Sequence, residues 1–145
     1  MRKEIATSTG FRFPMTLTYT WMKARFENNI EDSLFFGDVS RGDPVPYVPD
    51  NQIFATIGVR KGHWSMDLGV QYMDKLCTRP SCGQFERTDS RTLLDLGVHY
   101  QISKQLEIYS VIDNLTDSKF IAARQPYGAR PGKPRSWRLG VRLNF

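Results

Sequence analysis

The sequence predicts an all-β fold in which six antiparallel strands form part of the wall of a transmembrane β-barrel. Three observations support this prediction. Apolar and polar residues alternate with a period of two in six segments. Short and long connections between these segments alternate strictly. Aromatic residues reach 12% of a chain whose mean hydropathy is only −0.44, and no run approaches the roughly 18 apolar residues of a membrane helix.

The first predicted strand covers residues 11–22 and has the clearest alternation. Its odd positions are all apolar, and they read Phe11, Phe13, Met15, Leu17, Tyr19 and Trp21. Its even positions are mostly threonine, with Pro14 near the beginning, where a missing backbone donor is tolerated. A length of about ten residues suits a tilted strand that crosses a bilayer.

Five further segments repeat the alternation. They cover residues 53–60, 64–72, 94–102, 106–114 and 136–145. The segment 106–114 is less regular, because Tyr109 and Val111 fall on the same face as two carboxylates. Each segment is long enough for a barrel strand, and the period of two places its apolar side chains on one face of the sheet.

The connections indicate which end of the barrel is which. Lys61–His63 and Ser103–Gln105 are tight turns, whereas the links over about 27–51, 75–92 and 116–135 are long. Outer-membrane barrels combine short periplasmic turns with long extracellular loops. We therefore expect the long links to be extracellular.

The charged residues predict which face of the wall meets lipid. Four of them fall opposite the large apolar residues of their strands, namely Asp67, Asp95, Arg138 and Arg142. A charge facing lipid costs roughly 2–4 kcal/mol at the bilayer centre, so the apolar face is expected to face lipid. Aromatic residues at strand ends suit the membrane interface, at Trp64, Tyr72, Tyr100 and Trp137. A soluble antiparallel β module with an apolar interior remains an alternative.

The net charge of +5 does not predict a nucleic-acid partner, because lysine and arginine are scattered without a run of five. Met1-Arg2-Lys3 resembles the basic start of an export signal, but Glu4 and Thr7 stand where the apolar stretch should follow. The sequence therefore leaves two possibilities. The export signal lies upstream in a longer parent, or the chain is a truncated product.

Residues that could carry catalysis or hold a metal are sparse. His63 lies in a turn and His99 on the polar face, without ligand partners at suitable spacing. Asp67 and Asp95 share the polar face, where charges ordinarily pair with an enclosed domain or with water. We therefore predict no enzyme activity, no metal and no cofactor. Cys77 and Cys82 share one extracellular loop, and a local disulfide is the preferred interpretation.

The final strand ends on an aromatic residue. Its alternate positions are apolar, at Trp137, Leu139, Val141, Leu143 and Phe145. A C-terminal aromatic that closes an amphipathic strand resembles the signal read by the outer-membrane assembly machinery, which we therefore expect as a partner.

Several motifs resemble TonB-dependent receptors. Ile112 to Asp117, followed by Lys119-Phe120-Ile121, is similar to the N-L-F-D-x-x-Y segment of the penultimate barrel strand, with Thr116 and Phe120 in place of the usual aromatic and tyrosine. Residues 122–135 resemble the last extracellular loop of receptors of the ferric-dicitrate type. Residues 36–39 and 42–49 resemble that branch as well, the latter through a G-D-x-x-P-Y-x-P element.

The resemblance runs from about Thr9 to Phe145 and implies the last six strands of a roughly 22-stranded barrel. Residues 1–145 would then be the C-terminal part of an outer-membrane receptor of a Gram-negative bacterium. The plug domain and upstream strands would be absent, and TonB would act only through that missing plug. Six strands with open edges are not viable in lipid, so the fragment alone should not transport.

The resemblance implies active uptake of a ferric chelate, either a siderophore or ferric citrate. Such chelates are usually anionic, and the candidate contacts in the last loop are Arg124, Gln125, Tyr127 and Arg130. Arg79 and Arg87 in the cysteine loop are weaker candidates. A small structural barrel or adhesin remains an alternative, although six strands are fewer than the eight of small barrels.

Overall fold

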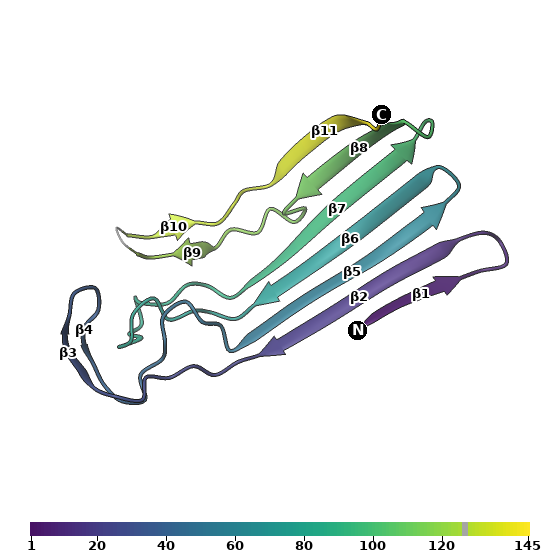
Figure 1. Ribbon diagram of the computed structural model, residues 1–145. Coiled ribbons are helices and arrows are strands. Elements are labelled where there is room, and N and C mark those ends of the chain that lie inside the picture. Colours follow the sequence, from purple (N-terminus) through teal and green to yellow (C-terminus); the bar gives the residue numbers. More distant parts are fainter. Residues whose placement is uncertain (126–127) are drawn as a thin grey trace.

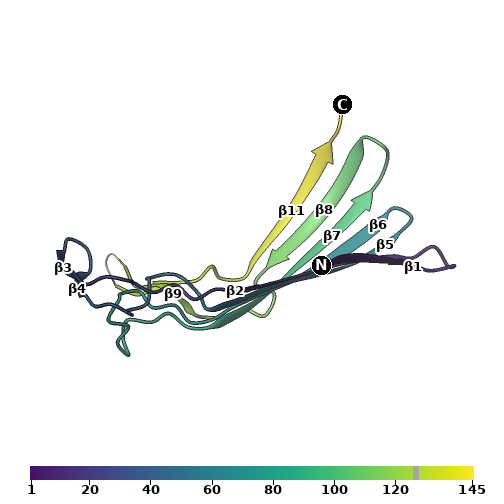
Figure 2. The same ribbon diagram turned by 60° about the horizontal axis from the view of Figure 1, so that its bottom comes forward.

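The computed structural model describes residues 1–125 and 128–145, and one curved antiparallel sheet dominates it (Figures 1 and 2). The seven strands of this main sheet are β1 (Arg2–Ala6), β2 (Arg12–Trp21), β5 (Asn51–Lys61), β6 (Trp64–Met73), β7 (Arg91–Gln101), β8 (Leu106–Asp113) and β11 (Ser136–Leu143). Two small ribbons lie in the connections, and they consist of β3 (Ile30–Ser33) with β4 (Gly37–Val39) and of β9 (Ile121–Ala123) with β10 (Arg130–Pro131).

The main sheet is an up-and-down array in the order β1-β2-β5-β6-β7-β8-β11. Every neighbouring pair is antiparallel. Figure 2 shows that β8 and β11 turn away from the plane of β1 and β2. This curvature is what a segment of barrel wall requires, because strands in a closed sheet must twist and tilt around a common axis.

The predicted number of six wall strands is wrong, because the main sheet has seven. The additional strand, β1, pairs with the start of β2, and the amino group of Met1 donates to the carbonyl oxygen of Leu17 (2.7 Å). Its sequence, RKEIA, is short and mostly charged, so it lacks an apolar face that alternation could reveal. Charged side chains are common on edge strands, where they discourage pairing with other chains.

The short connections all lie at one end of the main sheet and the long ones at the other, as Figure 1 shows. Gly62 at one short turn and Gly10 at the β1–β2 turn both have positive φ, which glycine adopts without steric cost. The three long connections are the first loop (22–50), the second loop (74–90) and the third loop (114–135).

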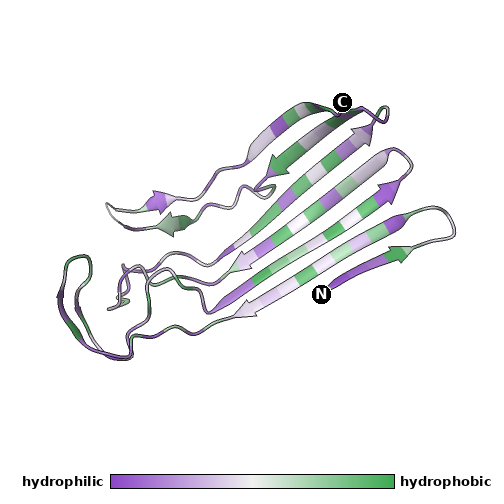
Figure 3. Cartoon of the chain, viewed as in Figure 1, coloured by the Kyte–Doolittle hydropathy of each residue, from purple (hydrophilic) through white to green (hydrophobic). Residues whose placement is uncertain are grey.

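The strand register aligns residues of one kind across the wall. One row of paired residues is entirely apolar, and it runs Met15, Ile57, Leu68, Leu96, Ile112, Trp137. The adjacent row on the opposite face is mostly charged or glycine, and it runs Gly58, Asp67, Gly97, Val111, Arg138. Figure 3 shows the resulting alternation of hydrophobic and hydrophilic bands along each strand. We call the two sides the apolar face and the polar face.

Tyr109 explains why the 106–114 segment is irregular. It lies on the polar face above Gly140, where an added Cβ would come within 2.4 Å of the tyrosine ring. The ring stacks on His99 at 5.8 Å between centroids, and the Arg142 guanidinium lies 5.6 Å from its centre. The aromatic residue therefore fills a space that Gly140 leaves open, and its parity does not mark the apolar face.

Large apolar side chains of the main sheet are exposed. Trp21 and Trp137 are each 67% exposed, and Leu139 is 66% exposed. The two buried hydrophobic residues among those described, Val39 and Leu76, lie instead in the first and second loops. The main sheet thus presents its hydrophobic surface outward.

Candidate functional site

The three long loops are joined to one another, and we call this joined region the loop platform. Tyr47 of the first loop makes the central contacts. Its backbone N–H donates to the carbonyl oxygen of Cys77 in the second loop (2.8 Å). Its hydroxyl accepts backbone N–H groups of the third loop from Arg124 (3.3 Å) and Gln125 (3.1 Å). One residue therefore connects all three loops.

The second and third loops are also bound directly. Nε of Arg124 donates to the carbonyl oxygen of Arg87 (2.6 Å). The carboxylate of Asp89 accepts the backbone N–H of Ile121 (2.7 Å), and the N–H of Asp89 donates to the carbonyl of Ile121 (3.3 Å). No local pattern in the sequence predicts these contacts, because the partners are more than thirty residues apart.

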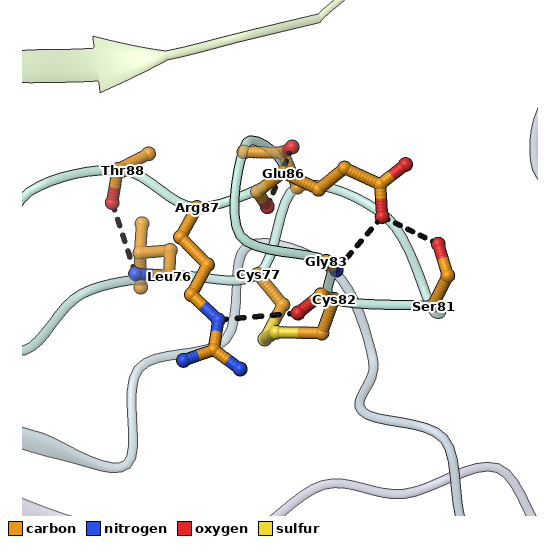
Figure 4. The surroundings of a disulfide bond; sticks show 9 residues. Leu76, Cys77, Ser81, Cys82, Gly83, Glu86, Arg87 and Thr88 are labelled. Atoms are coloured by element: carbon orange, nitrogen blue, oxygen red, sulfur yellow. Dashed lines mark hydrogen bonds between the residues drawn. A yellow bond between two sulfur atoms is a disulfide. The ribbon is translucent and has the colours of Figure 1, made fainter.

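A disulfide joins Cys77 to Cys82 within the second loop, with a Cα–Cα distance of 5.0 Å (Figure 4). Glu86 folds the same loop, because its carboxylate accepts the Ser81 hydroxyl and the backbone N–H of Gly83 (2.9 Å). These two hydrogen bonds hold the pKa of Glu86 below its usual range, and the bond from Ser81 has the larger effect. The loop is thus held by both a covalent bond and polar contacts.

The predicted ligand contacts lie in or beside this platform. Arg124 uses Nε to hold the second loop, so its side chain has a structural role in the described state. The backbone of Gln125 contacts Tyr47, whereas Arg130 is exposed in β10. Tyr127 lies outside the described residues. Arg79 is exposed, and Arg87 lies half-buried beside the disulfide.

Charges of the polar face are paired locally. His99 donates to Glu107 (3.1 Å), which also accepts Arg142 (2.9 Å). Asp67 accepts Arg60 (2.7 Å). Asp95 accepts the backbone N–H of Asn114 (2.8 Å). The two predicted polar-face carboxylates, Asp67 and Asp95, therefore have separate partners, and His63 contacts the carbonyl of Gln101 (2.7 Å).

Asn114 is the buried centre of the motif that follows β8. It is 3% exposed and has a positive φ of 50°, a conformation that asparagine adopts more readily than most residues. Its amide Nδ2 donates to the carbonyls of Ser118 and Lys133 (both 3.0 Å), and its Oδ1 accepts the Ser118 N–H (2.9 Å). Asn114 thereby ties the start of the third loop to its end.

The final strand, β11, lies at the edge of the main sheet and pairs only with β8 among the described strands. Its alternating apolar residues are all exposed, namely Trp137, Leu139, Val141 and Leu143, as is the terminal Phe145. At the loop end of β11, Asp113 accepts hydrogen bonds from Lys133, Ser136 and Arg138, which fix the strand against β8.

In residues 1–125 and 128–145 no helix is long and apolar enough to cross a membrane. Within the same residues, no three His, Cys, Asp or Glu side chains gather as a metal site would require.

Solved structures with this fold include two receptors. The chain superposes on the ferric-catecholate import receptor Fiu from K12 E. coli with a TM-score of 0.71 and 22% identity, covering 92% of this chain and 19% of that one. It superposes on the siderophore receptor PiuA from Acinetobacter baumannii with a TM-score of 0.76 and 17% identity, covering 97% and 20%. At such identities the likeness concerns the fold, and the chain spans about a fifth of either receptor.

No curated protein matches the sequence. The family model for the β-barrel of TonB dependent receptor-like proteins matches residues 4–115, which include most of the main sheet and the first two loops. That match covers well over half of the chain. The predicted family and the predicted β-barrel fold are therefore confirmed. The chain belongs to the TonB-dependent receptor β-barrel family.

Proposed function

We propose that residues 1–145 form the C-terminal part of the barrel of an outer-membrane receptor that imports a ferric chelate. The loop platform is the observation that supports this proposal. Tyr47 and Arg124 join three loops at one end of a sheet that belongs to the TonB-dependent receptor β-barrel family. A joined set of loops can present several side chains to one ligand in a fixed arrangement. Energy would come from TonB through a plug domain outside this chain.

The ligand would be an anionic siderophore complex or ferric citrate. Arg130 is the contact we favour in the third loop, because it is exposed and the structure gives its side chain no ion pair among the described residues. Arg124, Gln125 and Tyr127 would complete the contact, with Arg124 acting partly by positioning the loop. Guanidinium groups suit carboxylate and catecholate oxygens, because they donate two parallel hydrogen bonds.

The test is uptake of radiolabelled iron by cells that lack their own ferric-chelate receptors and express the complete receptor containing this segment. We expect import of at least one anionic chelate, lost when TonB is deleted. Arg130→Ala should raise the half-saturating concentration about tenfold, whereas Arg41→Ala, an exposed first-loop change, should not. Import that does not depend on TonB would contradict the proposal.

The outward-facing side chains of β11 support a second element of the proposal, recognition of this strand by the outer-membrane assembly machinery. Trp137 and Phe145 are both exposed, and β11 has a free edge among the described strands. Phe145→Ala should reduce the amount of folded receptor in the outer membrane several-fold without lowering its synthesis. An unchanged amount would exclude this role for the terminal aromatic.

A further inference from the structure

A cavity of about 490 Å³ lies between the first and second loops, beside the end of β6. Three cationic side chains line it, from Arg25, Lys75 and Arg87, together with the carboxylates of Asp50 and Asp74 and the ring of Tyr72. The cavity is separate from the third-loop residues proposed to contact the chelate, and it shares with the predicted contacts only Arg87, one of the weaker candidates. Its place on the wall indicates what it could bind.

The cavity borders the apolar face. Tyr72 belongs to that face of β6, and its hydroxyl donates to Asp74 (2.6 Å). The side chain of Asn51 extends this network. Its Nδ2 donates to Asp74 (2.7 Å), and its Oδ1 accepts the hydroxyl of Tyr19 (2.7 Å), another residue of the apolar face. The cavity therefore begins where the exposed apolar face ends.

The acidic residues do not neutralise the three cations by direct pairing. Both carboxylate oxygens of Asp74 accept hydrogen bonds from uncharged groups. Within the described part of the chain, the structure has no ion pair at Arg25, Lys75 or Arg87. Nε of Arg87 donates to the carbonyl of Cys82 (3.2 Å), as Figure 4 shows.

We propose that this cavity binds the phosphate group of a lipid headgroup at the outer surface of the membrane. Arginine forms paired hydrogen bonds to phosphate, and lysine supplies a compact charge. A soluble anion could reach any basic patch, but a patch at the border of an exposed apolar face is placed where acyl chains and a charged headgroup are bound together. The inference rests on the proposed membrane location of the wall.

The experiment measures binding of bisphosphoryl lipid A to the complete receptor in neutral detergent, beside lipid A from which the phosphates have been removed. We expect the bisphosphoryl form to bind at least tenfold more tightly. In the double variant R25Q/K75Q, the ratio of the two affinities should fall about tenfold. The matched variant K23Q/R41Q removes two exposed first-loop charges that do not line the cavity, and its affinity should stay within twofold.

Several outcomes would overturn the proposal. One is equal affinity for the two lipid forms, which is measured on the unaltered receptor and so does not depend on folding of any variant. Another is an unchanged preference in R25Q/K75Q. If inorganic phosphate occupied the site at the same concentration as the lipid, a soluble anion would be the ligand instead. Iron uptake, measured on the same proteins, tests the proposed function separately, since the third-loop contacts are left intact.

Discussion

The main sheet exposes its large apolar side chains, whereas the loop platform buries apolar side chains of its own. In the sheet, residues such as Trp64 and Leu139 are exposed, while the polar face carries paired charges. In the loops, Val39 and Leu76 are buried, as are the polar residues Thr78 and Thr88. One chain therefore contains a region arranged for a hydrocarbon environment and another arranged for water.

This difference separates the forces that hold the two regions. The sheet relies on its backbone ladder, because lipid offers no replacement for a lost hydrogen bond. The loops contain few paired strands and rely on specific side chains. Asn114 and Tyr47 bind backbone groups of distant segments, and Glu86 binds the backbone of its own turn. A sheet substitution that places a charge in lipid should therefore destabilise the whole barrel. A loop substitution that removes one contact should mainly loosen the segments which that contact joins.

The largest effect is expected when a charge is placed on the apolar face. Leu68 lies midway along β6 in the apolar row, so Leu68→Arg should lower the free energy of unfolding in lipid by about 2–4 kcal/mol. Gln71→Arg, on the polar face of the same strand, should cost less than about 1 kcal/mol, because the polar face already accommodates charge. Urea titration of the complete barrel in vesicles measures both. Equal losses would mean that the two faces do not differ in environment.

Asn114→Ala should cost about 2–3 kcal/mol, because it removes a buried amide and leaves the backbone groups that this amide binds, at Ser118 and Lys133, without that partner. The positive φ adds strain for alanine. The same titration measures the loss. Asn144→Ala is the control, since only the backbone N–H of Asn144 is bonded, to Gln105. If Asn114→Ala lowers the free energy of unfolding no more than this control does, Asn114 does not hold the two ends of the third loop together.

Removing the disulfide should lower the free energy of locally unfolding the second loop by about 2 kcal/mol. The cross-link closes a short loop and so reduces the entropy of the open state. Cys77→Ser with Cys82→Ser should speed hydrogen exchange over residues 76–88, measured by mass spectrometry, and leave β6 and β7 protected. Reducing agent should have the same effect on the unaltered protein. If exchange slowed or stayed constant, the polar contacts of Glu86 alone would hold the loop.

Tyr47→Phe removes the acceptor for two backbone N–H groups and should weaken the junction of the first and third loops by about 1 kcal/mol. Faster exchange at Arg124 and Gln125 is the expected result. Tyr19→Phe deletes a hydroxyl that bonds only Asn51, and it should leave those two amides unchanged. Identical exchange in both variants would place the junction elsewhere.

The smallest effect is expected from acid. The lowered pKa of Glu86 means that its contribution to the second loop is complete above the ordinary value of 4.5 and is lost as the pH falls through the lowered value. The amide chemical shift of Gly83, which donates to this carboxylate, should therefore titrate below pH 4.5. Glu86→Gln should abolish that titration, and a shift that persists would assign it to another group.

The sequence predicted the sheet better than the loops, for a physical reason. Alternation with a period of two reports directly on a wall with two unlike faces, as in the odd positions from Phe11 to Trp21. Strand β1 was missed because RKEIA contains no such contrast, and Tyr109 misled because it packs on Gly140. The contacts of Tyr47 and Asp89 could not be predicted, because their partners, Gln125 and Ile121, lie in another loop and depend on how the loops meet.

The two edges of the main sheet are unequal. Within the described residues, β1 and β11 each have a single neighbour, so each presents a row of backbone groups to a further strand. The five residues of β1 include three charges, whereas the eight of β11 carry exposed Trp137, Leu139, Val141 and Leu143. Pairing with an incoming strand is thus more favourable at β11. This edge is therefore also the one more open to faulty pairing with a strand of another chain.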